Sequence, residues 1–173
     1  MPSTPAHASR RSVVITGIGA VSPNGIGAEA YARACIEGRS GLSALQIDAP
    51  NLKTSAVAQV LNYDPAAVLG LSESRRVPRM IPMALQASRE ALAMAAVHFE
   101  PDDIESQRKI GVALGTGGGG LGFVEEQYRT FFTEGKGSLY SITSGTHGNL
   151  SSELSIALHL RGPSHARDRP RQR

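Results

Sequence analysis

Apolar residues recur along the chain in two ways, as short runs rich in β-branched side chains and as longer stretches with a helical period. The short runs predict strands at residues 13–15, 55–61 and 110–114. Stretches with apolar residues every three or four positions predict helices at residues 23–37, 81–97, 121–133 and 149–158. Because strands alternate with helices, we expect an α/β fold whose sheet is mainly parallel.

The ends of these segments carry turn and capping residues. Gly38 ends the first helix, and Asp64 starts a turn. Asn149 is expected to cap the last helix, because its side chain can accept a hydrogen bond from a free backbone N–H of the first turn. Cys35 stands on the apolar face of the first helix and is expected in the core. Its neighbour Glu37 is acidic, so nothing there predicts a reactive thiolate.

The composition suits one ordinary domain, or one half of a larger enzyme. The chain has 173 residues, of which 40% are apolar and 19% charged, and these values exclude a coiled coil, a collagen helix and wholesale disorder. A single Cys excludes an internal disulfide framework and a Cys-rich zinc site. No His lies three or four positions from another His or from the Cys, so we expect neither a metal site nor a cofactor.

The net charge of +3 comes from the end of the chain. Residues 166–173 hold four Arg against one Asp, and without them basic and acidic residues balance. A short tail of Arg and Pro is typically solvated, so no nucleic-acid partner is expected. No apolar run approaches the roughly 20 residues that a membrane helix needs, and residues 1–11 read as a disordered leader. These features predict a cytoplasmic protein.

Two glycine-rich turns and one Ser-Lys pair suggest particular chemistry, and each has a simpler interpretation. Residues 17–19 read Gly-Ile-Gly, but Ser22 stands where a dinucleotide-binding fingerprint needs its third Gly. Residues 115–120 lack the Lys-Ser/Thr pair of a phosphate-binding loop, which favours a tight turn between closely packed backbones. Ser106 and Lys109 match Ser-x-x-Lys within a charged stretch, where chance explains the match.

Three stretches of the chain carry a resemblance to one known family. Residues 13–25 read VVITGIGAVSPNG and are followed by GRSG at residues 38–41. Residues 111–126 join a predicted strand, a run of glycines and the sequence LGFVEE. Residues 138–165 begin with SLYSI and end with LRGPSH. In their order, spacing and amino-acid sequence, these stretches resemble the start of a β-ketoacyl-acyl carrier protein synthase, a condensing enzyme with the thiolase-like fold.

The resemblance implies an incomplete N-terminal half of the thiolase-like α/β fold, a mainly parallel mixed sheet with packed helices. Members of the family use a nucleophilic Cys at a helix N-terminus, where the helix dipole favours the thiolate. The resemblance places that Cys close to position 171, where this chain has Arg171. Two His and a Lys that assist decarboxylation of the malonyl donor come from the later half of the family's sequence. The resemblance therefore assigns no catalytic residue, and we expect this chain to be inactive.

The same resemblance implies one binding residue and two partners. Val124, in the helix after the glycines, matches a position near the fatty chain in relatives, although it can equally be a core residue. Intact relatives act on acyl carrier protein and form homodimers. Without its partner half, the sheet would keep an unpaired edge, so poor solubility is expected.

The resemblance, together with the composition of the two ends, divides the chain into a leader at residues 1–11, a partial synthase domain at residues 12–165 and a non-homologous basic tail at residues 166–173. The tail shows no strand pattern and resembles translation in a wrong reading frame, which suggests a frameshifted or truncated gene product. The encoding DNA tests this hypothesis. Two alternatives stay open: a non-catalytic companion subunit of a ketosynthase, and an unrelated small α/β binding domain.

Overall fold

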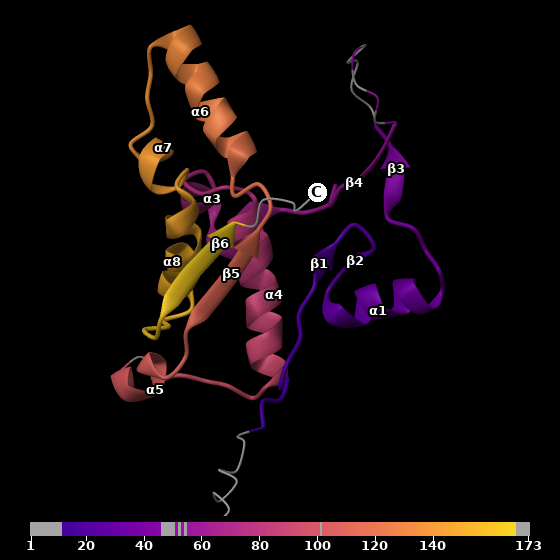
Figure 1. The fold of residues 1–173 in the computed structure, drawn as a ribbon, viewed down its shortest axis with the longest axis vertical. Coiled ribbons are helices and arrows are strands. Elements are labelled where there is room, and N and C mark those ends of the chain that lie inside the picture. The colour runs from indigo at the N-terminus through magenta and orange to yellow at the C-terminus, as the bar shows by residue number, and fades with distance from the viewer. Residues whose placement is uncertain (1–11, 46–50, 52, 54, 101, 169–173) are drawn as a thin grey trace, which may run out of the picture.

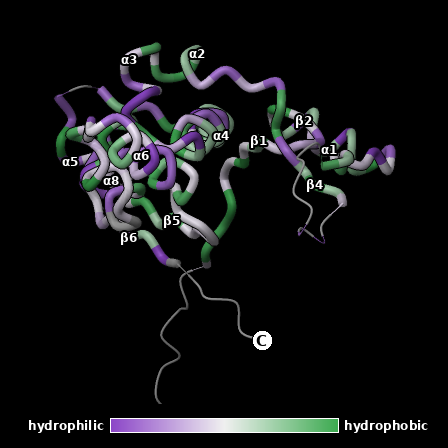
Figure 2. Tube along the Cα trace, turned by 90° about the horizontal axis from the view of Figure 1, so that it is seen from above, coloured by the Kyte–Doolittle hydropathy of each residue, from purple (hydrophilic) through white to green (hydrophobic). Residues whose placement is uncertain are grey.

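The computed structural model describes residues 12–45, 51, 53, 55–100 and 102–168, and these residues fall into two parts. We call the described residues up to 62 the N-terminal lobe, and residues 63–168 the body. Figure 1 shows the body as helices around one pair of strands, with the lobe beside α4. Seen from above in Figure 2, α1, β2 and β4 of the lobe lie apart from the cluster formed by α4, α5, α6 and α8.

The centre of the body is a parallel pair of strands covered by helices. Its elements are β5 (Val112–Thr116), β6 (Ser164–Asp168), α4 (Met80–Met94) and α8 (His147–Ala157). α8 contacts both strands, and α4 packs against α8. Ile81 of α4 and Leu150 of α8 are buried together with Val77, and Leu114 of β5 packs against them. Burying each of these side chains fully stabilises the body by about 1.5–3 kcal/mol, so the body has an apolar core.

Further helices complete the body, and the residues at their ends explain where they begin and end. They are α2 (Pro65–Leu69), α3 (Leu71–Ser74), α5 (Ile104–Arg108), α6 (Leu121–Glu134) and α7 (Tyr140–Thr143). Asp64 caps α2 by accepting a hydrogen bond from the Ala66 N–H at 2.9 Å. α6 lies between Gly120 and Gly135, both in the left-handed region that glycine enters without steric cost.

The N-terminal lobe contains one helix and two antiparallel ribbons. Its elements are β1 (Val21–Ser22), β2 (Gly25–Ile26), α1 (Ala28–Ile36), β3 (Leu42–Ala44) and β4 (Ala56–Ala58). β1 pairs with β2, and β3 pairs with β4. Among the described residues of the lobe only Ala28 and Ala34 are buried. Such small side chains bury little apolar area, so the lobe needs other contacts to hold its position.

Those contacts lie on one face of α4. A Cβ atom at Gly17 would lie 2.0 Å from the carbonyl oxygen of Ala91, and one at Gly19 would lie 1.9 Å from that of Ala87. The chain before β1 can therefore reach α4 only because both residues are glycine. Glu90, on the same face of α4, accepts hydrogen bonds from two backbone N–H groups of the lobe.

The predicted strands correspond only partly to the structure. Residues 13–15 form no strand, and Val13 and Ile15 are 96% and 87% exposed, so the predicted strand is wrong there. A β-branched run needs a neighbouring strand to cover it, and the described residues place none beside this run. The other two predicted strands are confirmed as β4 and β5. In the part of the chain that the structure describes, there are three two-stranded sheets, of which only β5–β6 is parallel, where one mainly parallel sheet was expected.

The two helices with the clearest apolar period are confirmed as α4 and α6. The first predicted helix begins later than expected, at Ala28, because the β1–β2 hairpin occupies the residues before it. Its buried face carries Ala28 and Ala34, and Cys35 is exposed, so the expectation of a core Cys35 is wrong. Four short helices among the described residues, α2, α3, α5 and α7, were not predicted, because four or five residues are too few to show a period.

The C-terminal elements also differ from expectation. α8 begins at His147, so Asn149 lies inside the helix and is not its cap; its amide donates to the Thr143 carbonyl instead. β6 runs to Asp168, past the position where the strand pattern was expected to end. Pairing with β5 supplies the backbone hydrogen bonds that hold Ala166 and Arg167 in this strand. The leader at residues 1–11 and the tail beyond Asp168 lie outside the described residues.

Candidate functional site

The glycine run at the end of β5 forms a tight turn in which two backbone N–H groups are bound by one side chain. Thr116 Oγ1 accepts hydrogen bonds from the N–H groups of Gly119 at 2.8 Å and Gly118 at 3.4 Å. At Gly120, a Cβ would lie 2.6 Å from Cγ of Pro78, the residue two positions before α4. The turn therefore fixes the start of α6 against the body, as the interpretation as a tight turn predicts.

Between α6, α7 and the start of α8 lies a groove of about 550 Å³. Val124, Tyr128 and Phe131 line it from α6, where positions three and four apart share a face. Ile142 of α7 lines the opposite side. Tyr128, Phe131 and Ile142 are 62%, 53% and 81% exposed, which is unusual for neighbouring large apolar residues unless the surface binds something. We call this feature the α6–α7 groove.

Val124 forms part of the wall of this groove and is half-buried. A Cβ at Gly145 would lie 2.8 Å from Cγ2 of Val124 and 2.4 Å from the carbonyl oxygen of Ser141. Gly145 therefore lets Val124 of α6 approach the end of α7 closely. Val124 does not belong to the cluster of buried side chains formed by Ile81 and Leu150.

The polar groups at the groove are neutral and largely satisfied within the protein. Ser141 donates to the carbonyl of Ser138 at 2.8 Å, and its hydroxyl lies 3.4 Å from Gln127 Oε1. None of the described lining residues is charged at neutral pH. The Arg76 guanidinium lies 4.7 Å from the centre of the Tyr140 ring, beside α7. Such a surface suits an apolar, uncharged ligand.

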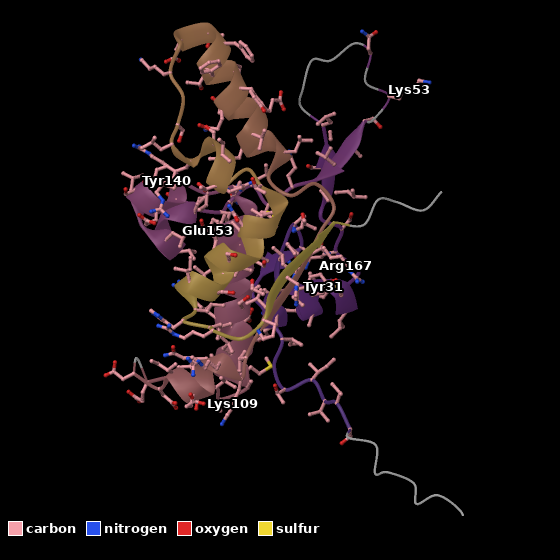
Figure 3. All side chains as sticks on the ribbon, turned by 60° about the vertical axis from the view of Figure 1, so that its left-hand side comes forward. Tyr31, Lys53, Lys109, Tyr140, Glu153 and Arg167 are labelled. Carbon is pink, nitrogen blue, oxygen red and sulfur yellow. The ribbon has the colours of Figure 1, made fainter. Side chains whose placement is uncertain are left out.

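The other residues with candidate chemistry lie elsewhere. In Figure 3, Lys109 lies at the far end of the body from Tyr140, so the Ser106–Lys109 pair has no part in the groove. Ser106 instead donates its N–H to Asp103, the cap of α5, and this serine lowers the pKa of Asp103 through hydrogen bonds, chiefly from its side chain. Cys35 lies on α1 of the lobe, where its hydrogen bond raises the pKa of Tyr31.

A second cleft, of about 440 Å³, lies in the lobe between the β1–β2 hairpin and residues 40–43 and 59–62. Two of its polar side chains bind the protein itself: the Asn24 amide donates to the Arg39 carbonyl at 2.9 Å, and Ser40 Oγ accepts from the Leu42 N–H at 3.2 Å. No group of three or more His, Cys, Asp or Glu side chains that could hold a metal occurs in the part of the chain that the structure describes. Arg171, the position expected for a nucleophile in relatives, lies outside the described residues.

Comparison with known proteins identifies relatives over nearly the whole chain. Residues 10–168 match the model of the family described as β-ketoacyl synthase, N-terminal domain. The 3-oxoacyl-[acyl-carrier-protein] synthase 2 of Coxiella burnetii is 32% identical over 158 residues, which are 90% of this chain and 37% of that protein. The chain therefore spans well under half the length of such relatives.

Solved structures of similar fold agree with this match. The ishigamide ketosynthase/chain length factor has a TM-score of 0.72 at 20% identity, over 90% of this chain and 39% of that one. A type II polyketide synthase acyl carrier protein in complex with its ketosynthase, AntDE:AntF, gives 0.66 at 19% identity, over 89% of this chain and 41% of that one. These likenesses confirm the predicted fold class, part of a thiolase-like α/β fold. Among the described residues, no helix is both long and apolar enough to cross a membrane.

Proposed function

The chain belongs to the β-ketoacyl synthase family, and from that premise we propose that it is part of a condensing enzyme of fatty acid or polyketide synthesis. In the reaction that we propose for the whole enzyme, a Cys sulfur takes an acyl group from a thioester. A malonyl thioester then loses carbon dioxide, and its enolate attacks the acyl carbon, which breaks the bond to the Cys sulfur and releases the thiolate. The residues that the structure describes form part of the enzyme's scaffold and part of the surface that binds the acyl chain.

The observation that carries this proposal is the α6–α7 groove, whose size and neutral, largely apolar lining support its assignment as an acyl-chain site. Its volume of about 550 Å³ lies in the range of about 300–1,000 Å³ typical of small-molecule sites. Binding an alkyl chain relies on burial of apolar surface, worth about 0.8 kcal/mol per CH₂. We propose that Val124 contacts the acyl chain, with Tyr128, Phe131 and Ile142 lining the rest of the groove.

Tryptophan fluorescence tests this assignment directly, because the chain has no Trp of its own. Phe131→Trp places the fluorophore in the groove, and Ile156→Trp places it on α8 at a position that is 72% exposed. We expect acyl-pantetheines to change the emission of Phe131→Trp alone, with affinity rising up to about fourfold per CH₂. Adding Val124→Phe should weaken that binding several-fold. An equal response of both reporters, or no dependence on chain length, contradicts the proposal.

We also propose that these 173 residues do not transfer acyl groups alone. The support is the resemblance, which aligns Arg171 with the family's nucleophile, and the position of Cys35 on α1, away from the α6–α7 groove. Incubation with acyl- and malonyl-acyl carrier protein should give no 3-oxoacyl product and no acylated protein by intact mass. An adduct that survives Cys35→Ser, or any turnover, would overturn this expectation.

Acyl carrier protein is the partner that we propose for the thioester donor, and a second ketosynthase-type subunit is the proposed oligomeric partner. The first is supported by the similar ketosynthase described in complex with its acyl carrier protein. For the second, we propose a homodimer, the form that the resemblance implies for intact relatives. Light scattering on the purified chain checks it. No observation on the described residues favours a non-catalytic companion subunit instead.

A further inference from the structure

One carboxylate connects the body to the N-terminal lobe at two points. Glu90 Oε1 accepts a hydrogen bond from the Ala28 N–H at 2.7 Å, and Oε2 accepts one from the Ala20 N–H at 3.0 Å. The donors lie 62 and 70 positions before Glu90 in the sequence. Both oxygens of a single half-buried side chain are therefore used to hold backbone of the other part of the molecule.

The two donors occupy positions that control the lobe. Ala28 is the first residue of α1, and the residue before it, Gly27, offers no side chain to cap the helix. Glu90 takes over the role of the cap, and its negative charge is favourable at a helix N-terminus. Ala20 lies just before β1, and its carbonyl accepts from the Gly27 N–H at 2.7 Å. Glu90 thus holds the base of the hairpin and the start of the helix together.

Just before α4, the Arg79 side chain donates a hydrogen bond to the Val60 carbonyl of the lobe, and along the helix itself glycine makes further contacts. Gly17 and Gly19 touch the backbone of Ala91 and Ala87, which determines how closely the chain approaches but supplies no directional bond. Residues 87, 90 and 91 share one face of α4 because they are three and four positions apart. Hydrogen bonds to a charged acceptor are stronger than those between neutral groups, so the carboxylate is the strongest link of this face to the lobe.

We propose that Glu90 is a clasp that sets the position of the N-terminal lobe on α4. Loss of the carboxylate releases the β1–β2 hairpin and α1 as a unit, and the body stays folded on its own apolar core. The lobe is then a separately opening element of the molecule, of the kind that native-state hydrogen exchange detects. This inference stands independently of the proposed reaction.

Amide hydrogen exchange on the full chain tests the clasp. Glu90→Gln keeps the shape of the side chain but places an NH₂ donor against one of the two N–H groups, and Glu90→Ala removes both acceptors. We expect exchange at Ala20, Ala28 and through α1 to be about ten- to a hundredfold faster, as loss of hydrogen bonds to a charged group predicts. Exchange in α8 and β5 should stay unchanged.

Glu125→Gln is the matched control, since it makes the same change of charge on the exposed face of α6. It should leave exchange in both parts as it is. Unchanged exchange of α1 in both Glu90 variants would overturn the proposal. So would equal acceleration in the lobe and the body, or loss of the whole fold in Glu90→Gln while Glu125→Gln folds, because a clasp acts on the lobe alone.

Discussion

In the body, leucine and isoleucine side chains from α4 and α8 bury one another beside β5, whereas in the N-terminal lobe only two alanines are buried among the described residues. The lobe is held instead by its backbone: two glycines pack on α4, two N–H groups are bound by one carboxylate, and the Val60 carbonyl is bound by Arg79. Burial is non-directional and tolerant of small shifts, while glycine contacts and hydrogen bonds depend on exact position. The two parts should therefore respond differently to substitution.

The largest effect is expected in the core of the body. Ile81 is 1% exposed and packs between Val77 and Leu150, so Ile81→Ala should lower the free energy of unfolding by about 2–5 kcal/mol. Denaturant unfolding followed by circular dichroism measures it. Met94→Ala, a change on the exposed end of the same helix, should cost well under half as much. Equal effects of the two would mean that α4 has no buried face in solution.

A smaller effect is expected where the lobe meets α4. Gly19→Ala would place a Cβ 1.9 Å from the Ala87 carbonyl oxygen, and relieving this overlap should cost about 1–3 kcal/mol. We expect α1 and the β1–β2 hairpin to lose protection from hydrogen exchange before the body does. Gly118→Ala is the control, because a Cβ there meets no atom within 4 Å. If Gly19→Ala leaves the lobe protected, the glycine contacts do not position it.

Helix ends provide a finer comparison. The chain after α1 turns through Gly38 in the left-handed region, and the same turn after α4 and α8 uses Ala96 and His159, with φ of 53° and 55°. A residue with a Cβ is strained there, so Ala96→Gly and His159→Gly should each stabilise the body by about 0.5–1 kcal/mol. Ala95→Gly, in right-handed conformation, should destabilise instead. Thermal melts compare the three variants. A change of melting temperature in the same direction for Ala95→Gly and Ala96→Gly would contradict the strain at Ala96.

The smallest effect concerns pH. Hydrogen bonds from Ser106, chiefly its hydroxyl, lower the pKa of Asp103 from its ordinary value of 3.8. A lowered pKa in the folded state means that the ionised Asp103 stabilises α5 above pH 3.8 and that this contribution is lost as the pH falls through the lower folded value. Asp103→Asn should therefore remove a small part of the acid sensitivity below pH 4. Acid-induced unfolding of the parent chain and of Asp103→Asn checks this expectation, and identical unfolding curves would contradict it.

The parts of the structure that sequence reasoning could predict are those encoded by neighbouring residues. α4 and α6 follow from apolar residues three and four positions apart, and the tight turn before α6 follows from its glycines. The apolar face of α6 that lines the groove was visible in the same way. The opposite wall, with Ile142, was not, because α7 is too short to show a period and reaches α6 only through the fold.

The errors came from contacts between distant segments. The position of Cys35 depends on which face of α1 meets other residues, and the two buried alanines gave a weaker signal than the larger side chains beside them. No local signal marks Glu90, which in the sequence is one acidic residue on an amphipathic helix. Its role appears only when residues 62 and 70 positions away are brought to it.

Motif order and spacing alone were enough to determine the family, and periodicity was enough to determine the main helices, because both are properties of the chain read along its length. Only the folded molecule decided which glycines touch α4, which acid holds the lobe, and that α6 and α7 together enclose a neutral groove. Those outcomes depend on atoms that are remote in sequence, and packing in three dimensions alone selects among the many pairings that the same pattern allows.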